Sequence, residues 1–243
     1  MSGDAILTVE ALSAWYGAAQ ILFELGFEVG RGEVVALMGR NGAGKSTTMK
    51  TIMGLVGRRR GRVRFDGHDI LGLEPYRIAR LGVGFTPEDR RIFSDLTVLE
   101  NLDIGRQQPR SFRDGKPAPA WTTDKLFALF PNLAERPDNL GSQMSGGEQQ
   151  MLTVARTLMG NPLLVLLDEP SEGVAPLIVE QMAATIVELK KQGLSILLSE
   201  QNLPFAELVC DRVCLLEKGH IAWHGAMAEL TRDTELQRTF LTM

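Results

Sequence analysis

The sequence has little of what metal clusters and disulfide frameworks require. Its 243 residues include only 2 cysteines and 3 histidines, too few for a disulfide-stapled scaffold or for a zinc site built on three or four cysteines. Cys210 and Cys214 lie in an apolar stretch at 208–216. We therefore expect two buried thiols in a reducing compartment.

Long apolar runs are also absent. The wholly apolar run at 163–167 is far too short to cross a bilayer, and no other run exceeds it. Residues 1–4 have neither the basic start nor the apolar core of a signal peptide. We expect a chain that is soluble in itself and that, if it works at a membrane, works from the surface.

A surplus of positive charge is missing as well. Lys and Arg number 26 against 30 Asp and Glu, for a net charge of −4, which argues against a general nucleic-acid binder. The basic run at 58–60, followed by Arg62 and Arg64, is expected to form a solvated loop at the start of a strand. Hydrophobic residues make up 44% of the chain, enough for the core of one large domain or two small ones.

Residues 39–47 match the spacing of a phosphate-binding loop. The loop lies between a β-prone run and a run that can be helical, which is the context that this motif needs. Its glycines let backbone N–H groups turn onto an anion, and the helix start adds a positive dipole end. We expect Lys45 to reach the β- and γ-phosphates and Ser46 to bind Mg²⁺. The residues predicted to contact the nucleotide here are Gly39, Arg40, Asn41, Gly42, Ala43, Gly44, Lys45, Ser46 and Thr47.

The pattern along the chain predicts an α/β fold, with an antiparallel N-terminal part and a mixed or parallel sheet. Strands are expected at 6–9, 21–29, 33–38, 62–65, 81–85, 163–167, 195–198 and 212–217. Helices are expected at 97–106, 123–130, 148–159, 176–192, 203–209 and 234–243, with a surface loop at 107–120. We interpret the chain as one domain, in which a helical subdomain at 88–160 is inserted into a core formed by 1–87 and 161–243.

The strand at 163–167 ends in two carboxylates, Asp168 and Glu169. Beside a phosphate loop, Asp168 is expected to support Mg²⁺ together with Ser46, and Glu169 to orient and polarise the attacking water. An ordinary strand followed by an acidic turn is the alternative. The segment 145–150, Ser-Gly-Gly-Glu-Gln-Gln, opens a helix and offers a second anion site.

The phosphate loop, the segment at 145–150 and Leu-Leu-Asp-Glu-Pro at 166–170, in this order, resemble an ABC transporter ATPase subunit over almost the whole chain. The resemblance implies ATP and Mg²⁺, and a head-to-tail dimer with two ATP molecules at the interface. In that dimer Ser145, Gly146 and Gly147 contact the ATP held by the opposite subunit. An aromatic on the adenine is also implied, and Tyr16 fits that position. A partly buried core tyrosine is the alternative for Tyr16.

Four positions depart from the usual family pattern. Glu88 stands where Gln is usual, Gln201 where His is usual, Ala175 where Asp is usual and Met144 where Leu is usual. With the segments Pro-Glu-x-Arg-Arg, Ser-Glu-Gly-x-Ala-Pro and Glu-Gln-Asn, this pattern is similar to the second ATP-binding subunit of branched-chain (hydrophobic) amino acid importers.

The two polar substitutions change the chemistry that the family resemblance implies. Gln201 can donate a hydrogen bond to the γ-phosphate but carries no imidazolium charge. Glu88 brings a carboxylate where the amide would be neutral. Lys45, Glu169 and Gln201 are the predicted catalytic residues. We expect Glu88 and Gln201 to preserve hydrolysis and to alter how it is coupled to the membrane subunits.

The resemblance implies several partners at the cytoplasmic face of the bacterial inner membrane. They are two polytopic permease subunits, a second ATP-binding subunit, and indirectly a periplasmic solute-binding protein. A homodimer is the alternative to a pair of different ATPase subunits. Arg90, Arg91 and Phe93 are expected to line a groove for a helix of a membrane subunit, with a solvated turn as the alternative for the two arginines.

Other functions stay open at the level of sequence. The motor never touches the transported compound, so an amide, an aromatic acid or a lipid is an alternative to an amino acid. A regulatory nucleotide-binding subunit with weak hydrolysis is a second alternative. A soluble ABC-type ATPase of DNA repair or translation is a third, which the single core and the acidic balance disfavour.

Overall fold

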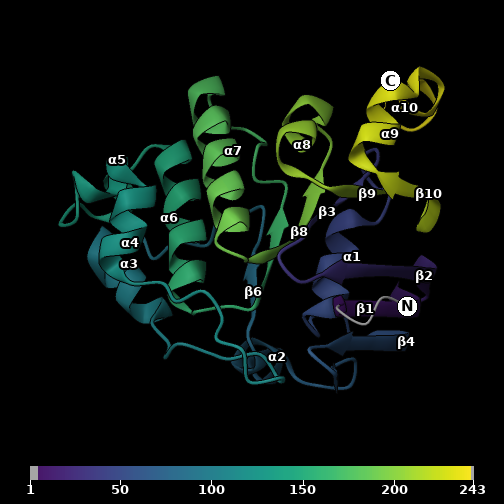
Figure 1. The fold of residues 1–243 in the computed structure, drawn as a ribbon, viewed down its shortest axis with the longest axis horizontal. Helices are drawn as coiled ribbons and strands as arrows, with labels where there is room; N and C mark the ends of the chain where they lie inside the picture. The colour runs from purple at the N-terminus through teal and green to yellow at the C-terminus, as the bar shows by residue number, and fades with distance from the viewer. Residues whose placement is uncertain (1–4, 242–243) are drawn as a thin grey trace.

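The computed structural model describes residues 5–241 (Figure 1). Residues 1–4, where no signal peptide was expected, and the last two residues of the predicted C-terminal helix lie outside this range. Within it the chain forms two sheets, and two clusters of buried apolar side chains hold the elements together.

The N-terminal part is a four-stranded antiparallel sheet in the order β2-β1-β4-β5. Its strands are β1 (Ala5–Tyr16), β2 (Ala19–Gly30), β4 (Arg58–Phe65) and β5 (His68–Asp69). Leu7 of β1 pairs with Val29 on one side and Phe65 on the other. All three side chains are buried in the smaller apolar cluster, so cross-strand apolar pairs stabilise this sheet. The predicted antiparallel N-terminal part is confirmed.

The centre of the molecule is a six-stranded sheet in the order β10-β9-β3-β8-β7-β6. Its strands are β3 (Val34–Met38), β6 (Val83–Thr86), β7 (Leu164–Asp168), β8 (Ser195–Glu200), β9 (Arg212–Glu217) and β10 (His220–Ala226). All neighbours are parallel except β10 with β9. In register, Asp168 pairs with Ser199 and Met38 with Glu200. The loops that follow β3, β7 and β8 therefore meet at one edge of the sheet, where ligands of open α/β sheets bind.

Helices cover the central sheet and form a lobe beside it (Figure 1). They are α1 (Lys45–Ile52), α2 (Pro75–Leu81), α3 (Val98–Gly105), α4 (Thr123–Leu129), α5 (Pro131–Ala134), α6 (Gly146–Met159), α7 (Pro176–Lys191), α8 (Leu203–Val209), α9 (Met227–Arg232) and α10 (Thr234–Phe240). Helices α3 to α6 gather on the side away from the antiparallel sheet. Leu152 of α6 and Ile186 of α7 are both buried in the larger apolar cluster, which joins this lobe to the central sheet.

Two of these helices begin at capping boxes that the sequence already contains. Thr97 caps α3 and Ser145 caps α6, each accepting a hydrogen bond from the backbone N–H three residues on. Glu100 and Glu148 bond back to the two capping residues. Because this reciprocal pair satisfies N–H groups that a helix end leaves free, it fixes where the helix begins.

The basic run at 58–60 was expected in a loop, but it belongs to β4. Arg58 and Arg60 are exposed, as expected, whereas Arg59 is half-buried. The Arg59 guanidinium donates to the backbone oxygens of Leu71 and Val56, both at 2.6 Å. The Arg58 guanidinium carbon lies 4.8 Å from the centre of the Trp15 ring, a cation–π distance. Part of this positive charge therefore ties β4 to the neighbouring loops and to β1.

Five short elements, α2, α5, α9, β5 and β10, were not predicted. Residues 81–85 were expected to form one strand, but α2 ends at Leu81 and Gly82 follows with a φ of 113°. Glycine adopts this left-handed conformation without a steric penalty, so β6 starts only at Val83. The expected loop at 107–120 contains no helix or strand, only one isolated bridge between Ser111 and Pro117.

The C-terminal helix packs on the chain's own core. Leu236 and Phe240 of α10 contact the larger apolar cluster. The predicted buried thiols are found, since Cys210 and Cys214 are free and buried; burial raises the pKa of Cys214 to about 12 and raises that of Cys210 further. No helix among residues 5–241 is long and apolar enough to cross a membrane.

Candidate functional site

The loop between β3 and α1 has a backbone that only glycine tolerates easily. Gly39, Gly42 and Gly44 have φ values of 150°, 79° and 110°. A Cβ atom at Gly39 would overlap the backbone oxygen of Leu216, and one at Gly44 would lie 2.8 Å from the Leu22 side chain. The backbone therefore turns tightly enough for successive N–H groups to face a common point, as a phosphate requires.

Lys45, the first residue of α1, is folded back into this loop. Its side chain is buried, and its Nζ donates to the backbone oxygens of Gly39 at 2.9 Å and Arg40 at 3.3 Å. The same Nζ lies 3.1 Å from Oε1 of Glu169. The predicted phosphate-binding lysine and the predicted catalytic carboxylate thus form a buried ion pair.

Asp168, at the end of β7, is held by two hydroxyl groups. Ser46 Oγ donates to Asp168 Oδ1 at 2.9 Å, and Ser199 Oγ donates to the same atom at 2.6 Å. Carboxylate and hydroxyl oxygens are the ligands that Mg²⁺ prefers, usually with phosphate oxygens and waters completing the set. The pair Ser46 and Asp168 fits such an ion, and no cage of three or more His, Cys, Asp or Glu exists among residues 5–241.

Glu169 lies one residue beyond Asp168 and takes a rare backbone conformation. Its φ is 48°, in the region that side chains other than glycine seldom adopt. Its backbone N–H is held by the hydroxyl of Ser199 at 3.0 Å. This turn aims the carboxylate into the site, where Oε2 accepts a hydrogen bond from Nε2 of Gln201 at 2.9 Å.

Glu200, which sequence reasoning missed, supports the turn that carries Gln201. The side chain is buried and accepts hydrogen bonds from the backbone N–H groups of Ser171 (3.1 Å), Gln201 (2.8 Å) and Asn202 (2.9 Å). One carboxylate therefore joins the loop after β7 to the loop after β8. An acidic residue at the end of an apolar strand was the available signal.

Lys45, Ser46 and Glu169 lie on the wall of a cavity of about 510 Å³. It is lined by Ile21, Asn41, Gly42, Gly44, Lys45, Ser46, Thr47, Glu88, Glu169 and Glu172. The cavity wall therefore contains Glu88 and six of the phosphate-loop residues that were predicted to contact the nucleotide, namely Asn41, Gly42, Gly44, Lys45, Ser46 and Thr47. Glu172, a third carboxyl group at this cavity, had not been singled out as a site residue.

The carboxyl groups of Glu169 and Glu172 perturb each other. A side-chain hydrogen bond to Glu169, together with burial, raises the pKa of Glu172 to about 7. Burial alone would raise the pKa of Glu169, yet hydrogen bonds from Glu172 and Lys45 hold it below its usual value. Below about pH 7 the pair therefore carries one proton, on Glu172, with the negative charge on Glu169.

The remaining predicted site residues do not line this cavity. Tyr16 lies at the end of β1 with 49% of its surface exposed, and the nearby wall is formed by Ile21 of β2. Ser145, Gly146 and Gly147 lie at the start of α6 in the helical lobe. Contacts of these four residues with a nucleotide stay predictions, as do those of the residues on the cavity wall.

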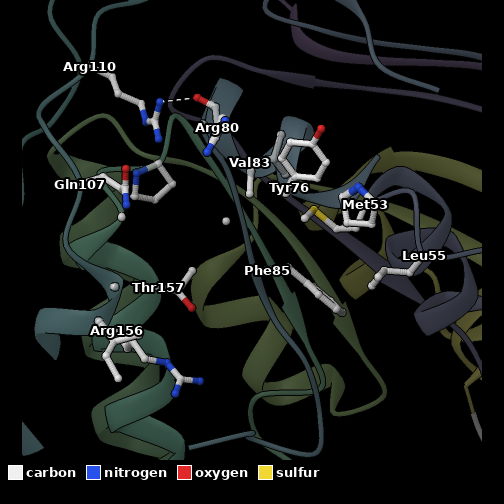
Figure 2. A pocket seen from close by; sticks show the side chains of 18 of the residues that line it. Met53, Leu55, Tyr76, Arg80, Val83, Phe85, Gln107, Arg110, Arg156 and Thr157 are labelled. Atoms are coloured by element: carbon white, nitrogen blue, oxygen red, sulfur yellow. Dashed lines mark hydrogen bonds between the residues drawn. The ribbon is translucent and has the colours of Figure 1, made fainter. Parts of the chain in front are cut away.

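A second hollow, here called the lobe groove, lies between the core and the helical lobe and has a volume of about 700 Å³. Figure 2 shows Met53, Leu55 and Tyr76 along one side, with Arg156 and Thr157 of α6 along the other. Its apolar residues include several that are half exposed. They are Leu55 (51%), Tyr76 (54%), Phe93 (47%) and Ile104 (53%).

The predicted groove residues are divided between two places. Phe93 lines the lobe groove, and the Arg156 guanidinium lies 5.1 Å from its ring centre. Arg90 and Arg91 line a smaller hollow beside it, together with Glu88. Both arginines have positive φ values, 61° and 50°, so this connection between the two sites is a tight turn.

Comparison with known proteins identifies the relatives of the chain. The ABC transporter family model matches residues 22–172. The high-affinity branched-chain amino acid transport ATP-binding protein BraG of Pseudomonas aeruginosa is 40% identical, over 97% of this chain and 99% of BraG. The lipopolysaccharide export system ATP-binding protein LptB of Escherichia coli is 34% identical, over 98% of this chain and 97% of LptB. The crystal structure of a nucleotide-free ATP-binding cassette from an ABC transporter has a TM-score of 0.79 at 28% identity, and the match covers 96% of this chain and 97% of that one.

Phosphate loop, acidic strand end and cavity thus define a phosphate-loop ATPase. The extent of the matches specifies it further: the chain belongs to the ABC transporter family, as an ATP-binding subunit. The predicted fold class and the predicted ATPase class are confirmed.

Proposed function

We propose that this subunit drives import of branched-chain or other hydrophobic amino acids through partner membrane subunits. The observation that carries the proposal is the 40% identity to BraG over almost the full length of both chains. Glu88, Gln201 and Ala175 depart from the usual family pattern. The pattern that they form resembles that of the second ATP-binding subunit of branched-chain amino acid importers.

The arrangement around Glu169 supports a mechanism for hydrolysis. Glu169 is assigned to orient the water that attacks the γ-phosphorus and to accept its proton. Lys45 is assigned to neutralise the β- and γ-phosphates. Because its Nζ lies 3.1 Å from Glu169, ATP has to draw the ammonium group from the carboxylate to the phosphates. Losing this cation makes Glu169 a stronger base when ATP is present.

Ser46 and Asp168 are the residues that would hold Mg²⁺. The ion supplies positive charge that neutralises the phosphate oxygens. Ser199 keeps the Asp168 carboxylate in place through its 2.6 Å hydrogen bond. Gln201 is assigned to hold Glu169 and to donate to the γ-phosphate.

A second ATP-binding subunit is proposed to complete the site. Ser145, Gly146 and Gly147 lie in the helical lobe, away from the cavity of their own chain, which supports contact with the ATP of an opposite subunit. Tyr16 is exposed at the end of β1, which leaves its ring available to stack on an adenine. We assign the helical subdomain to 88–160 and the core to 1–87 and 161–243.

The lobe groove is the proposed seat of a helix from a permease subunit. Half-exposed apolar side chains concentrated in one hollow are typical of helix-in-groove recognition. Its wall also contains Arg156, whose guanidinium donates to the backbone oxygen of Arg91 at 2.6 Å. That contact connects the groove to the turn that carries Glu88. On this proposal the chain works at the cytoplasmic face of the bacterial inner membrane, with two permease subunits and indirectly a periplasmic solute-binding protein.

Lipopolysaccharide export is a second candidate, because LptB is 34% identical over 98% of this chain. Uptake of labelled leucine, isoleucine and valine by cells that lack the gene distinguishes the two. We expect uptake to fall and to be restored by the wild-type chain but not by Glu169→Gln. Normal uptake with a leaking outer membrane would instead support lipopolysaccharide export. Co-purification with two membrane subunits and a second ATPase would identify the partners.

A further inference from the structure

Glu172 lines the cavity beside the phosphate loop together with Glu169, and the mechanism above leaves it without a role. This cavity, where ATP is proposed to bind, is here called the ATP cavity. Glu172 lies three residues after Glu169, in the loop that follows β7. Its backbone N–H donates to the backbone oxygen of Glu169 at 3.1 Å. Glu169 and Gly173 both have positive φ values, 48° and 64°. The loop is therefore a tight turn that brings the Glu172 side chain back toward the carboxylate of Glu169.

The contact between the carboxyl groups of Glu169 and Glu172 depends on protonation and on the charges around it. Two carboxyl groups form a hydrogen bond only when one of them keeps a proton. Lys45 is the cation in contact with Glu169, while Glu88 and Glu200 add negative charge near Glu172. The Arg90 guanidinium donates to the backbone oxygen of Gly173, at 3.4 Å.

Binding of ATP increases the negative charge around Glu169 and Glu172. The triphosphate brings several negative charges and takes Lys45 away from Glu169. The base then keeps only neutral donors, which are the amide of Gln201 and the carboxyl group of Glu172. A second carboxylate at the position of Glu172 would repel both the base and the phosphates.

We infer that Glu172 is a positioning residue for hydrolysis, which in its protonated form donates a hydrogen bond that holds Glu169 in place as Lys45 moves to the phosphates. The inference rests on the role proposed for Glu169. In the step itself, the water oxygen bonds to the γ-phosphorus, and the bond from phosphorus to the bridging oxygen breaks with its electrons going to ADP. The water proton goes to Glu169, and Glu172 keeps its own proton throughout.

The inference predicts how turnover depends on pH. The pKa of Glu172 is raised to about 7, so its proton, and with it the hydrogen bond, is lost as pH rises through about 7. That value belongs to the protein without ATP, so we expect kcat/KM of the full chain to fall over that range. We expect kcat to fall only at higher pH, because the negative charge of bound ATP raises the pKa of Glu172 further. Glu172→Gln donates without titrating, so it should keep wild-type turnover at low pH and lose this alkaline fall. Glu172→Ala should reduce kcat about tenfold at low pH, because it removes a hydrogen bond to a charged group.

Two other carboxyl variants serve as comparisons. Glu88→Gln removes negative charge that raises the pKa of Glu172, so it should move the alkaline fall to lower pH. Glu207→Gln removes an equal charge on the exposed face of α8 and should leave the profile unchanged. Infrared difference spectra of wild type against Glu172→Gln should contain a protonated carboxyl band that disappears near pH 7, whatever the rate of turnover.

An alkaline fall in Glu172→Gln equal to that of the wild type, or no titrating carboxyl band, would overturn the inference. The role of Glu169 is tested separately, because Glu169→Gln should slow turnover by at least about a hundredfold at every pH. Full turnover in that variant would refute the proposed base, even if the profile of Glu172→Gln behaved as expected.

Discussion

The side-chain amide of Gln201 donates to Oε2 of Glu169 at 2.9 Å, while Lys45 holds Oε1 of the same carboxylate at 3.1 Å. The residue that stands where the family usually has a histidine thus contacts the proposed base directly. Glutamine keeps a fixed, neutral donor at this place, whereas an imidazole changes its charge near neutral pH.

Removing this donor should slow the chemical step. We expect Gln201→Ala to lower kcat about tenfold, with a smaller change in the KM for ATP, because a hydrogen bond to a charged group is lost. Gln201→His should recover part of the activity. Steady-state ATPase kinetics of the full chain measure both, and wild-type turnover in Gln201→Ala would contradict the proposed role.

Glu169→Gln should bind ATP and hydrolyse it at least a hundredfold more slowly, since general-base catalysis contributes roughly 10²–10⁴ in rate. Because the bound ATP is not hydrolysed, we expect the variant to accumulate as a closed dimer. Analytical ultracentrifugation with and without ATP tests this. A monomer under both conditions would count against the head-to-tail arrangement.

The phosphate loop should be intolerant of a single methyl group at Gly39. A Cβ there overlaps the backbone oxygen of Leu216, and the φ of 150° is unfavourable for alanine. We expect Gly39→Ala to destabilise the fold by more than about 1 kcal/mol and to abolish ATP binding. Gly57→Ala is the control, because no atom lies within 4 Å of a Cβ there and its φ is not positive. Thermal unfolding and ATP titration of the two variants provide the comparison.

A charge placed in the lobe groove should weaken assembly with the membrane subunits and leave the free ATPase intact. Leu55 is 51% exposed on the groove wall, so Leu55→Glu is expected to fold normally. Leu208 is 66% exposed on α8 and lies outside the groove, which makes Leu208→Glu the matched control. Co-purification of the permease subunits with each variant tests the prediction. Equal recovery with both would exclude the groove as the docking site.

Glu88 should affect coupling more than hydrolysis. Its carboxyl group lines both the ATP cavity and the small hollow that contains Arg90 and Arg91. We expect Glu88→Gln to retain basal ATPase activity within about threefold and to change the stimulation of that activity by the membrane subunits. Comparing turnover of the free chain and of the reconstituted transporter checks this, and unchanged stimulation would refute it.

Much of the phosphate site could be predicted from sequence, because its parts are local. The glycine spacing at 39–47 and the apolar strand before Asp168 can each be recognised within a few consecutive residues. Glu200 and Ser199 were missed because their roles depend on the register between β8 and β7, and no local pattern encodes that pairing.

The prediction of a loop at 58–60, which belongs to β4, was wrong for a related reason. Consecutive arginines are usually solvated, and only the fold places the backbone oxygens of Leu71 and Val56 around Arg59. Likewise α2 was hidden, because its boundary is set by Gly82 and its packing against the core rather than by a long periodic pattern. For Tyr16 the structure alone does not test the prediction, since the predicted stacking partner is the adenine of a bound nucleotide.

Ser199 has a single hydroxyl group, and two neighbours use it at once. It donates to Asp168 and accepts from the backbone N–H of Glu169. The carboxylate that would face the metal ion and the backbone of the residue that would orient the water are therefore both bonded to one hydroxyl group on β8. Any displacement of that strand moves both together, so the spacing between metal and base is preserved while the strand itself shifts. A movement transmitted through the turn after β8 would therefore change the positions of Asp168 and Glu169 together, and with them the rate of hydrolysis.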